Sequence, residues 1–225
     1  MSATPPPADL RARILAAASA DPAPPRAQGT RATATAILAG FVVPVAVSFY
    51  LGWPSAANRP ASYVGCLAAA WLAVGLFATW GGVARGQSML GRPTALRLGV
   101  VLLTPALLLT TAMVGALAWP GTLADDATMG NHLVCDAFAL LCALGPLVAF
   151  AVVRRGSDPV APRLTGAAIG AASGAWGALA IHLHCAHTSP THVVFGHILP
   201  VAVLALVGVV IGDRVVAVRA RSEAR

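Results

Sequence analysis

The sequence predicts an all-α integral membrane protein, a six-helix transmembrane bundle with short cytoplasmic tails. Of its 225 residues, 57% are hydrophobic and only 10% are charged, whereas a soluble domain carries about 25% charged residues. Spanning a membrane takes roughly 20 apolar residues. Six runs reach that length, at about 32–52, 61–83, 96–118, 132–153, 164–185 and 194–212.

Residues 1–31 form a polar, Pro-rich lead before the first span. A short helix is predicted from about residue 9 to residue 20, between two proline clusters. Its apolar positions follow the spacing of an amphipathic helix; they are Leu10, Ile14, Ala17 and Ala18. A helix this short is marginal alone in water. The segment is therefore either a frayed tail or a peptide that folds onto a cytosolic partner.

The first three spans are expected to be structural. The first ends at Trp53, an aromatic residue typical of the membrane interface. The second carries Cys66 near one end, and Trp71 and Trp80 are interpreted as packing or interfacial residues. The third is rich in Leu and Thr. Three spans contain a proline: Pro44, Pro105 and Pro146. Neighbouring helices can satisfy the backbone groups that a proline frees, so kinked helices are expected and not broken ones.

The fourth span brings ionisable and thiol groups into the membrane region. It opens with residues 131–136, which include Asp136. An acidic residue within a span is a functional candidate, but this one lies near the end of the span and can equally reach water. Cys142 lies two turns deeper and is expected to pack as a small hydrophobe.

The fifth span has a glycine face and ends in soft ligand side chains. Glycines recur every four residues, which leaves one smooth helix face where a neighbouring helix can come close; they are Gly166, Gly170 and Gly174. The span closes on His182, His184 and Cys185. This helix is expected to be the working part of the protein.

The arginines predict the orientation. All fifteen basic residues are arginine. Thirteen fall in the two tails or in the second and fourth loops, Arg97 lies at the start of the third span beside the second loop, and only Arg59 is on the other side. This asymmetry places both termini in the cytoplasm. The expected units are a tail at 1–31, a transmembrane domain at 32–212 in contact with lipid, and a basic tail at 213–225. The net charge of +7 reflects this topology, and direct binding of nucleic acid is not expected.

Cys135 and Cys185 are predicted to lie at similar depth near the outer ends of consecutive antiparallel helices. At 1.5 Å per residue, they lie roughly 27 Å and 32 Å from the cytoplasmic ends of their spans. The glycine face is expected to bring the two helices together. Each cysteine closes a His-x-x-Cys pattern, with His132 and His182 on the same face one turn earlier.

This pattern leaves several chemistries open. Two His and two Cys suit a tetrahedral zinc or other transition-metal site, two histidines suit haem iron, and two cysteines alone suit a disulfide in an oxidising periplasm. Alternatively, the side chains are interfacial or packing residues, the reading favoured for His187, His192 and His197. The candidate ligands are His132, Cys135, His182, His184 and Cys185.

A combination of features resembles the NrsF-like family of six-span inner-membrane anti-sigma factors. The features are Cys135, Gly145-Pro146, the turn from Arg154 to Pro162, the glycine face and His184-Cys185. The resemblance covers about residues 131–200 well and the six-span layout throughout. It implies a bacterial inner-membrane protein that holds an extracytoplasmic-function sigma factor, with the tail at 1–31 as the binding segment and Cys135 and Cys185 as the family's outer cysteine pair.

The predicted function is therefore a membrane-bound anti-sigma factor, not an enzyme, that releases its sigma factor on an oxidative, metal or other signal. One alternative is a membrane thiol oxidoreductase, but such enzymes usually carry a CxxC pair, which this chain lacks. A metal- or haem-binding membrane protein is a second alternative. A small transporter is a third, and ionisable groups near mid-bilayer would favour it.

Overall fold

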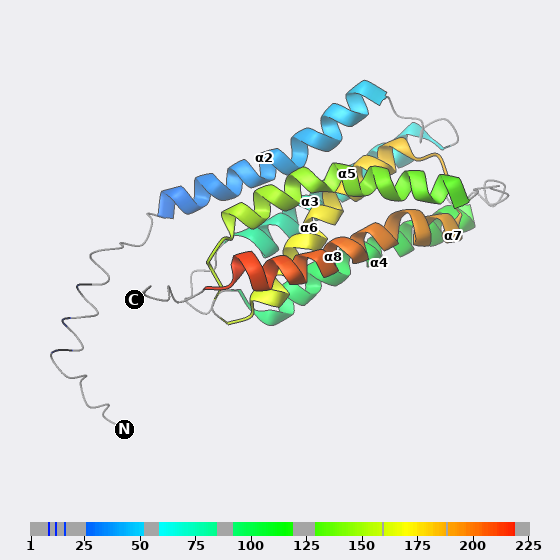
Figure 1. Ribbon diagram of the computed structural model, residues 1–225. Coiled ribbons are helices and arrows are strands. Elements are labelled where there is room, and N and C mark those ends of the chain that lie inside the picture. The colour runs from blue at the N-terminus through cyan, green and yellow to red at the C-terminus, as the bar shows by residue number, and fades with distance from the viewer. Residues whose placement is uncertain are drawn as a thin grey trace.

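The structure, a computed structural model, describes residues 26–51, 59–84, 92–118, 129–158, 160–187 and 189–218, with single positions 9, 12 and 16. That part of the chain holds six helices long and apolar enough to cross a membrane, side by side in one bundle (Figure 1). They are α2 (Arg26–Leu51), α3 (Ala61–Val83), α4 (Thr94–Ala118), α5 (Met129–Val153), α6 (Pro162–His184), and a last helix made of α7 (Pro190–Val193), η3 (Val194–Ile198), α8 (Leu199–Ile211) and η4 (Gly212–Val216). The predicted fold class is confirmed. The proposed sigma-binding positions Leu10, Ile14, Ala17 and Ala18 lie outside the described residues.

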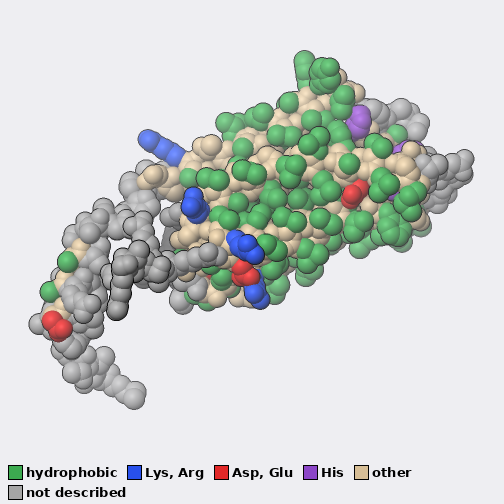
Figure 2. All heavy atoms as spheres, in the orientation of Figure 1, with side chains coloured by type: hydrophobic (Ala, Val, Ile, Leu, Met, Phe, Trp, Pro, Cys, Tyr) green, Lys and Arg blue, Asp and Glu red, His purple; other side chains and the backbone are tan. Residues whose placement is uncertain are grey.

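The bundle has two ends, which we call proximal and distal. The proximal end holds the start of α2 and the end of η4, and the distal end holds the end of α6 and the start of α7 (Figure 1). Figure 2 shows hydrophobic side chains along the length of the face drawn, with arginines toward the proximal end. Pro44, Pro105 and Pro146 each lie inside a continuous helix, so the spans are not broken.

The last helix is longer than the sequence indicated. It begins at Pro190 and its helical winding reaches Val216, whereas the apolar run predicted residues 194–212. Its first turn is polar and was therefore not counted in the span. Ser189 caps this turn, because its side-chain oxygen accepts a hydrogen bond from the backbone N–H of His192. As a result, His192 belongs to the helix.

Helix α6 forms the centre of the bundle. Nearly all of it, 94% of its most apolar stretch, is buried inside the protein. Its Trp176 is fully buried and donates a hydrogen bond from Nε1 to Oγ1 of Thr79 on α3, at 2.9 Å. Gly40 on α2 and Gly75 on α3 lie against the same indole ring. The indole thereby connects three helices.

The glycine face of α6 packs against α8, which corrects the expectation that it brings α5 and α6 together. A Cβ at Gly166 or Gly170 would overlap the backbone of α8, at the carbonyl oxygens of Gly208 and Leu204. The close contact between α6 and α5 lies at Gly177, where a Cβ would sit 2.6 Å from the carbonyl oxygen of Ala139. Four-residue spacing identified a packing face but could not identify the helix that it faces.

Candidate functional site

Two thiols meet at the distal end of the bundle. Cys135 lies near the start of α5, and Cys185 follows the last residue of α6 in an extended conformation with φ −82° and ψ 125°. Their Sγ atoms are 3.6 Å apart, and both are free cysteines. The expected proximity of the pair is therefore seen. The other two cysteines are elsewhere: Cys66 is exposed on α3 and Cys142 is buried deeper in α5.

Two histidines of the last helix complete a compact group with the thiols. Cys135, Cys185, His192 and His197 each place one potential ligand atom within 4.8 Å of all the others. Nε2 of His192 lies 3.3 Å from Sγ of Cys185. The rings of His192 and His197 are nearly perpendicular, with an interplanar angle of 85° and centroids 5.1 Å apart. We call these four residues the Cys–His group.

A π-helical turn lets both histidines reach the thiols. Residues five apart on a regular α-helix point about 140° away from each other, at 3.6 residues per turn. The turn η3 follows His192 and contains His197, and its capping residue Leu199 bonds back five residues to the carbonyl of Val194. This i→i+5 winding widens the turn and reduces the angle between residues five apart. The two imidazoles can therefore face the same partners.

The histidines that the sequence favoured lie around this group and not in it. The ring of His132 is 5.0 Å from that of His192 and stacks on Phe195. His184 stacks on Phe138, with centroids 4.9 Å apart. His182 lines a neighbouring cavity. His182 and Cys185 do not share a helix face, because α6 ends at His184 and Cys185 is extended.

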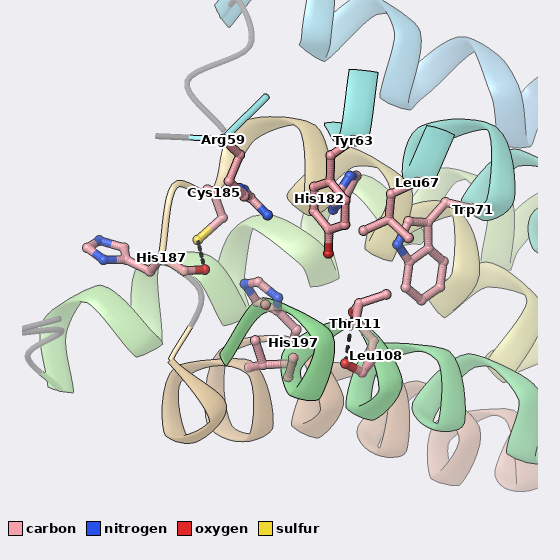
Figure 3. Close-up of a pocket in the computed structure, with 13 residues that line it drawn as sticks. Arg59, Tyr63, Leu67, Trp71, Leu108, Thr111, His182, Cys185, His187 and His197 are labelled. Carbon is pink, nitrogen blue, oxygen red and sulfur yellow. Dashed lines mark hydrogen bonds between the residues drawn. The ribbon is translucent and has the colours of Figure 1, made fainter. Parts of the chain in front are cut away.

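The cavity has a volume of about 30 Å³ and borders the Cys–His group. Figure 3 shows Cys185 and His187 at one end of it and Leu67 and Trp71 at the other. Arg59 reaches over this region and donates a hydrogen bond from its guanidinium to the backbone carbonyl of Cys185, at 3.1 Å. Burial lowers the pKa of Arg59, and interactions with Tyr63 and Cys185 partly offset this.

Several imidazole nitrogens near the group are buried without a hydrogen-bond partner among the described residues. They include Nδ1 of His192 and Nε2 of His197 and of His182. His192 is fully buried and His197 is 6% exposed. Buried polar groups normally have partners, so this concentration of unpaired nitrogens at one place indicates a site for a ligand. The half-buried Asp136 is not part of the Cys–His group.

The proximal end holds a second polar cluster, which the sequence reasoning missed. Asp158, in the loop between α5 and α6, is 1% exposed and accepts a hydrogen bond from Arg97 at 3.1 Å. Arg154 lies 3.8 Å away and Oγ1 of Thr165 donates to the same carboxylate. Burial alone would raise the pKa of Asp158, but the bond from Thr165, two backbone N–H donors and Arg97 hold it below its ordinary value. The signal available in the sequence was an Asp followed by Pro in an Arg-rich turn.

The same loop is hydrogen-bonded to the last residues of η4 and pairs with the residue that follows it. The backbone N–H of Gly156 donates to the carbonyl of Val215 at 2.8 Å, and that of Ser157 donates to Val216 at 2.9 Å. Asp158 and Ala217 form a parallel β-bridge. The loop that joins α5 to α6 therefore holds the beginning of the C-terminal tail.

In the comparison with known proteins, one family model matches the chain. The family model described as NrsF, negative regulator of sigma F, matches residues 16–217, which is most of the chain. No curated protein and no solved structure matches.

Proposed function

Because the chain belongs to the NrsF family of negative regulators of sigma F, we propose that it is a membrane-bound anti-sigma factor that sequesters an extracytoplasmic-function sigma factor. The match over residues 16–217 carries this proposal. Membership of the family supports a negative regulator whose partner is a sigma factor. The six apolar helices suggest a membrane protein. The sigma-factor class, the bacterial inner membrane as location and the absence of enzymatic activity are parts of the proposal.

The proposed orientation puts the proximal end in the cytoplasm. Fourteen of fifteen arginines support it by the positive-inside rule. The distal Cys–His group then lies on the periplasmic side of the membrane, and the buried Asp158 cluster lies on the cytoplasmic side. Reporter fusions after Arg92 and Arg155 should read cytoplasmic and fusions after Arg59 should read periplasmic. One reversed loop would overturn this orientation.

The sigma factor is proposed to bind the tail at residues 1–31. The only apolar stripe of that segment is formed by Leu10, Ile14, Ala17 and Ala18, and an amphipathic helix of this kind can lie in an apolar groove of a partner. A sigma factor should co-purify with the full-length protein from its own membranes. Leu10→Asp with Ile14→Asp should abolish that co-purification.

The matched control for this test is Ala12→Asp with Ser19→Asp, which adds the same charges. On a helix these two positions lie opposite Leu10, so the control should still capture the sigma factor. Both variants must remain in the membrane fraction at equal amounts. If the stripe variant retains the sigma factor, the interface lies elsewhere, for example on the loops of the proximal end or on the C-terminal tail.

The Cys135–Cys185 pair is proposed as the place where a signal acts. Cys135 lies on α5 and Cys185 directly follows α6, and the loop that joins these two helices is hydrogen-bonded to residues 215 and 216. A link between the two thiols would fix the distal ends of α5 and α6. Making or breaking it can change sigma binding only if the two states differ in their free energy of binding. Helices α5 and α6, together with the loop that joins their proximal ends, provide a contiguous route between the two ends of the bundle.

Thiol substitutions test this role. Cys135→Ser and Cys185→Ser should change sigma release alike, and the double variant should add little to either, because both remove the same link. Cys66→Ser and Cys142→Ser are matched controls and should leave release unchanged. Different effects of the two distal substitutions, or no effect of either, would show that the pair does not act as one unit.

A further inference from the structure

We propose that Cys135, Cys185, His192 and His197 form a binding site for one thiophilic divalent transition-metal ion such as Zn²⁺. The inference concerns metal binding by this chain. It rests on the proposed function only where metal binding would affect the release of a sigma factor.

The separations within the group fit a tetrahedral metal site. Zn–S bonds of about 2.3 Å and Zn–N bonds of about 2.0–2.1 Å place two sulfurs roughly 3.8 Å apart, and a sulfur and a nitrogen roughly 3.6 Å apart. The two Sγ atoms are 3.6 Å apart, and Sγ of Cys185 is 3.3 Å from Nε2 of His192. A disulfide has its sulfurs about 2.05 Å apart. The group has the spacing of metal ligands around a shared centre.

Burial of the imidazoles points to the same conclusion. His192 and His197 are both more than nine-tenths buried, and Nε2 of His192 lies beside Sγ of Cys185. Buried polar groups normally have partners. A metal ion would engage the ring nitrogen that lies beside the thiols, while Nδ1 of His192 remains available to an outer partner. The π-helical turn η3, which brings His197 toward His192, is a kind of irregularity often found at functional sites.

The ligand set selects the class of ion. Two thiolates and two imidazoles suit Zn²⁺ and related soft or borderline ions, whereas Mg²⁺ and Ca²⁺ require oxygen ligands. Binding replaces two S–H bonds with two metal–sulfur bonds and releases two protons to solvent, with no change in oxidation state. The rings of His132 and His187 both lie 5.0 Å from that of His192, so they can influence its orientation as outer neighbours.

Cobalt is the most direct probe of this site. The full-length protein, purified in detergent, reduced and treated with a chelator, should bind one Co²⁺ per chain. It should show the absorption bands of tetrahedral cobalt and thiolate-to-cobalt charge transfer. Zn²⁺ should displace the cobalt, and its binding should protect Cys135 and Cys185 from alkylation while Cys66 stays reactive.

Histidine variants separate this site from the alternatives. His192→Gln and His197→Gln should each weaken Co²⁺ binding by at least about 10-fold. The control variants His182→Gln and His184→Gln should bind as the wild type does. His197→Cys should still bind tetrahedral cobalt, because three thiolates and one imidazole also make a zinc-type site. This rescue distinguishes loss of a ligand from loss of the fold, and helical circular dichroism checks every variant.

Three results would overturn the proposal. They are octahedral cobalt without thiolate charge transfer, unchanged affinity in the His192 and His197 variants, and failure of the reduced chain to take up Co²⁺ or Zn²⁺. None of these measurements involves a sigma factor. A chain that captures a sigma factor but binds no metal refutes only the metal site, and a chain that binds metal but captures no sigma factor refutes only the proposed function.

Discussion

Asp158 should be the most sensitive charged residue of the proximal end. Its carboxylate, 1% exposed, bonds Arg97 and lies beside Arg154, and both guanidinium groups are also buried. Asp158→Asn preserves the shape of the side chain and can still accept the backbone N–H groups of Val160 and Ala161, which now bond Oδ1. The substitution removes the charge and also replaces Oδ2, which accepts from Arg97 and Thr165, with an amide donor. Breaking a buried ion pair on one side costs about 3–5 kcal/mol, because the remaining charge stays buried and unpaired.

The chain offers a matched exposed pair as the control. Arg163 and Asp213 form an ion pair with an N–O distance of 2.7 Å, but their side chains are 73% and 41% exposed. Asp213→Asn should therefore lower the free energy of unfolding by less than about 1 kcal/mol. The measurement is an unfolding titration with SDS in mixed micelles, followed by helical circular dichroism. Equal losses for the two variants would refute the reasoning that burial of the Asp158 cluster sets its contribution.

Further predictions concern pH and packing. The pKa of Asp158 is held below its ordinary value. Its contribution to the free energy of unfolding should therefore be complete above about pH 4 and be lost as the pH falls through the depressed pKa. In unfolding titrations against pH, Asp158→Asn should not show this loss of stability at low pH. Gly170→Ala, whose Cβ would overlap the Leu204 carbonyl, should lower the midpoint of SDS unfolding and cost about 1–3 kcal/mol. Gly65→Ala, with open space around it, should leave the midpoint unchanged or raise it, because Ala favours a helix over Gly. Equal midpoints for the two variants would contradict the close α6–α8 contact. Trp176→Phe removes the bond to Thr79 and should cost about 1–2 kcal/mol by the same titration, and an unchanged midpoint would mean that this bond adds no stability.

The helices were predictable because length and hydrophobicity alone determine a membrane span. Each predicted run corresponds to one helix, and the common depth of Cys135 and Cys185 followed from the rise per residue. The partner of the glycine face was not predictable. Gly166 and Gly170 show only that some helix comes close, and the choice of α8 depends on how all six helices arrange themselves around α6.

The composition of the Cys–His group was half predictable. The sequence indicated both thiols but paired them with His132 and His182, on the assumption of continuous α-helix. Two local departures broke that assumption: the chain leaves α6 before Cys185, and the last helix contains a π turn that follows His192 and includes His197. Neither departure has a period that a sequence pattern reveals. The polar cluster around Asp158 was missed because its arginines come from separate segments of the chain.

The burial of α6 has a consequence for how the protein enters the membrane. Its most apolar stretch has a mean hydropathy of 1.4, the lowest of the six candidate spans, whereas the last helix reaches 2.6. A helix enclosed by other helices needs no surface for lipid tails, so small residues replace large apolar ones along it. Such a segment partitions weakly into lipid on its own. We therefore expect α6 to stay near the translocon during synthesis until α8 emerges, so that the last helix to be made secures the one at the centre.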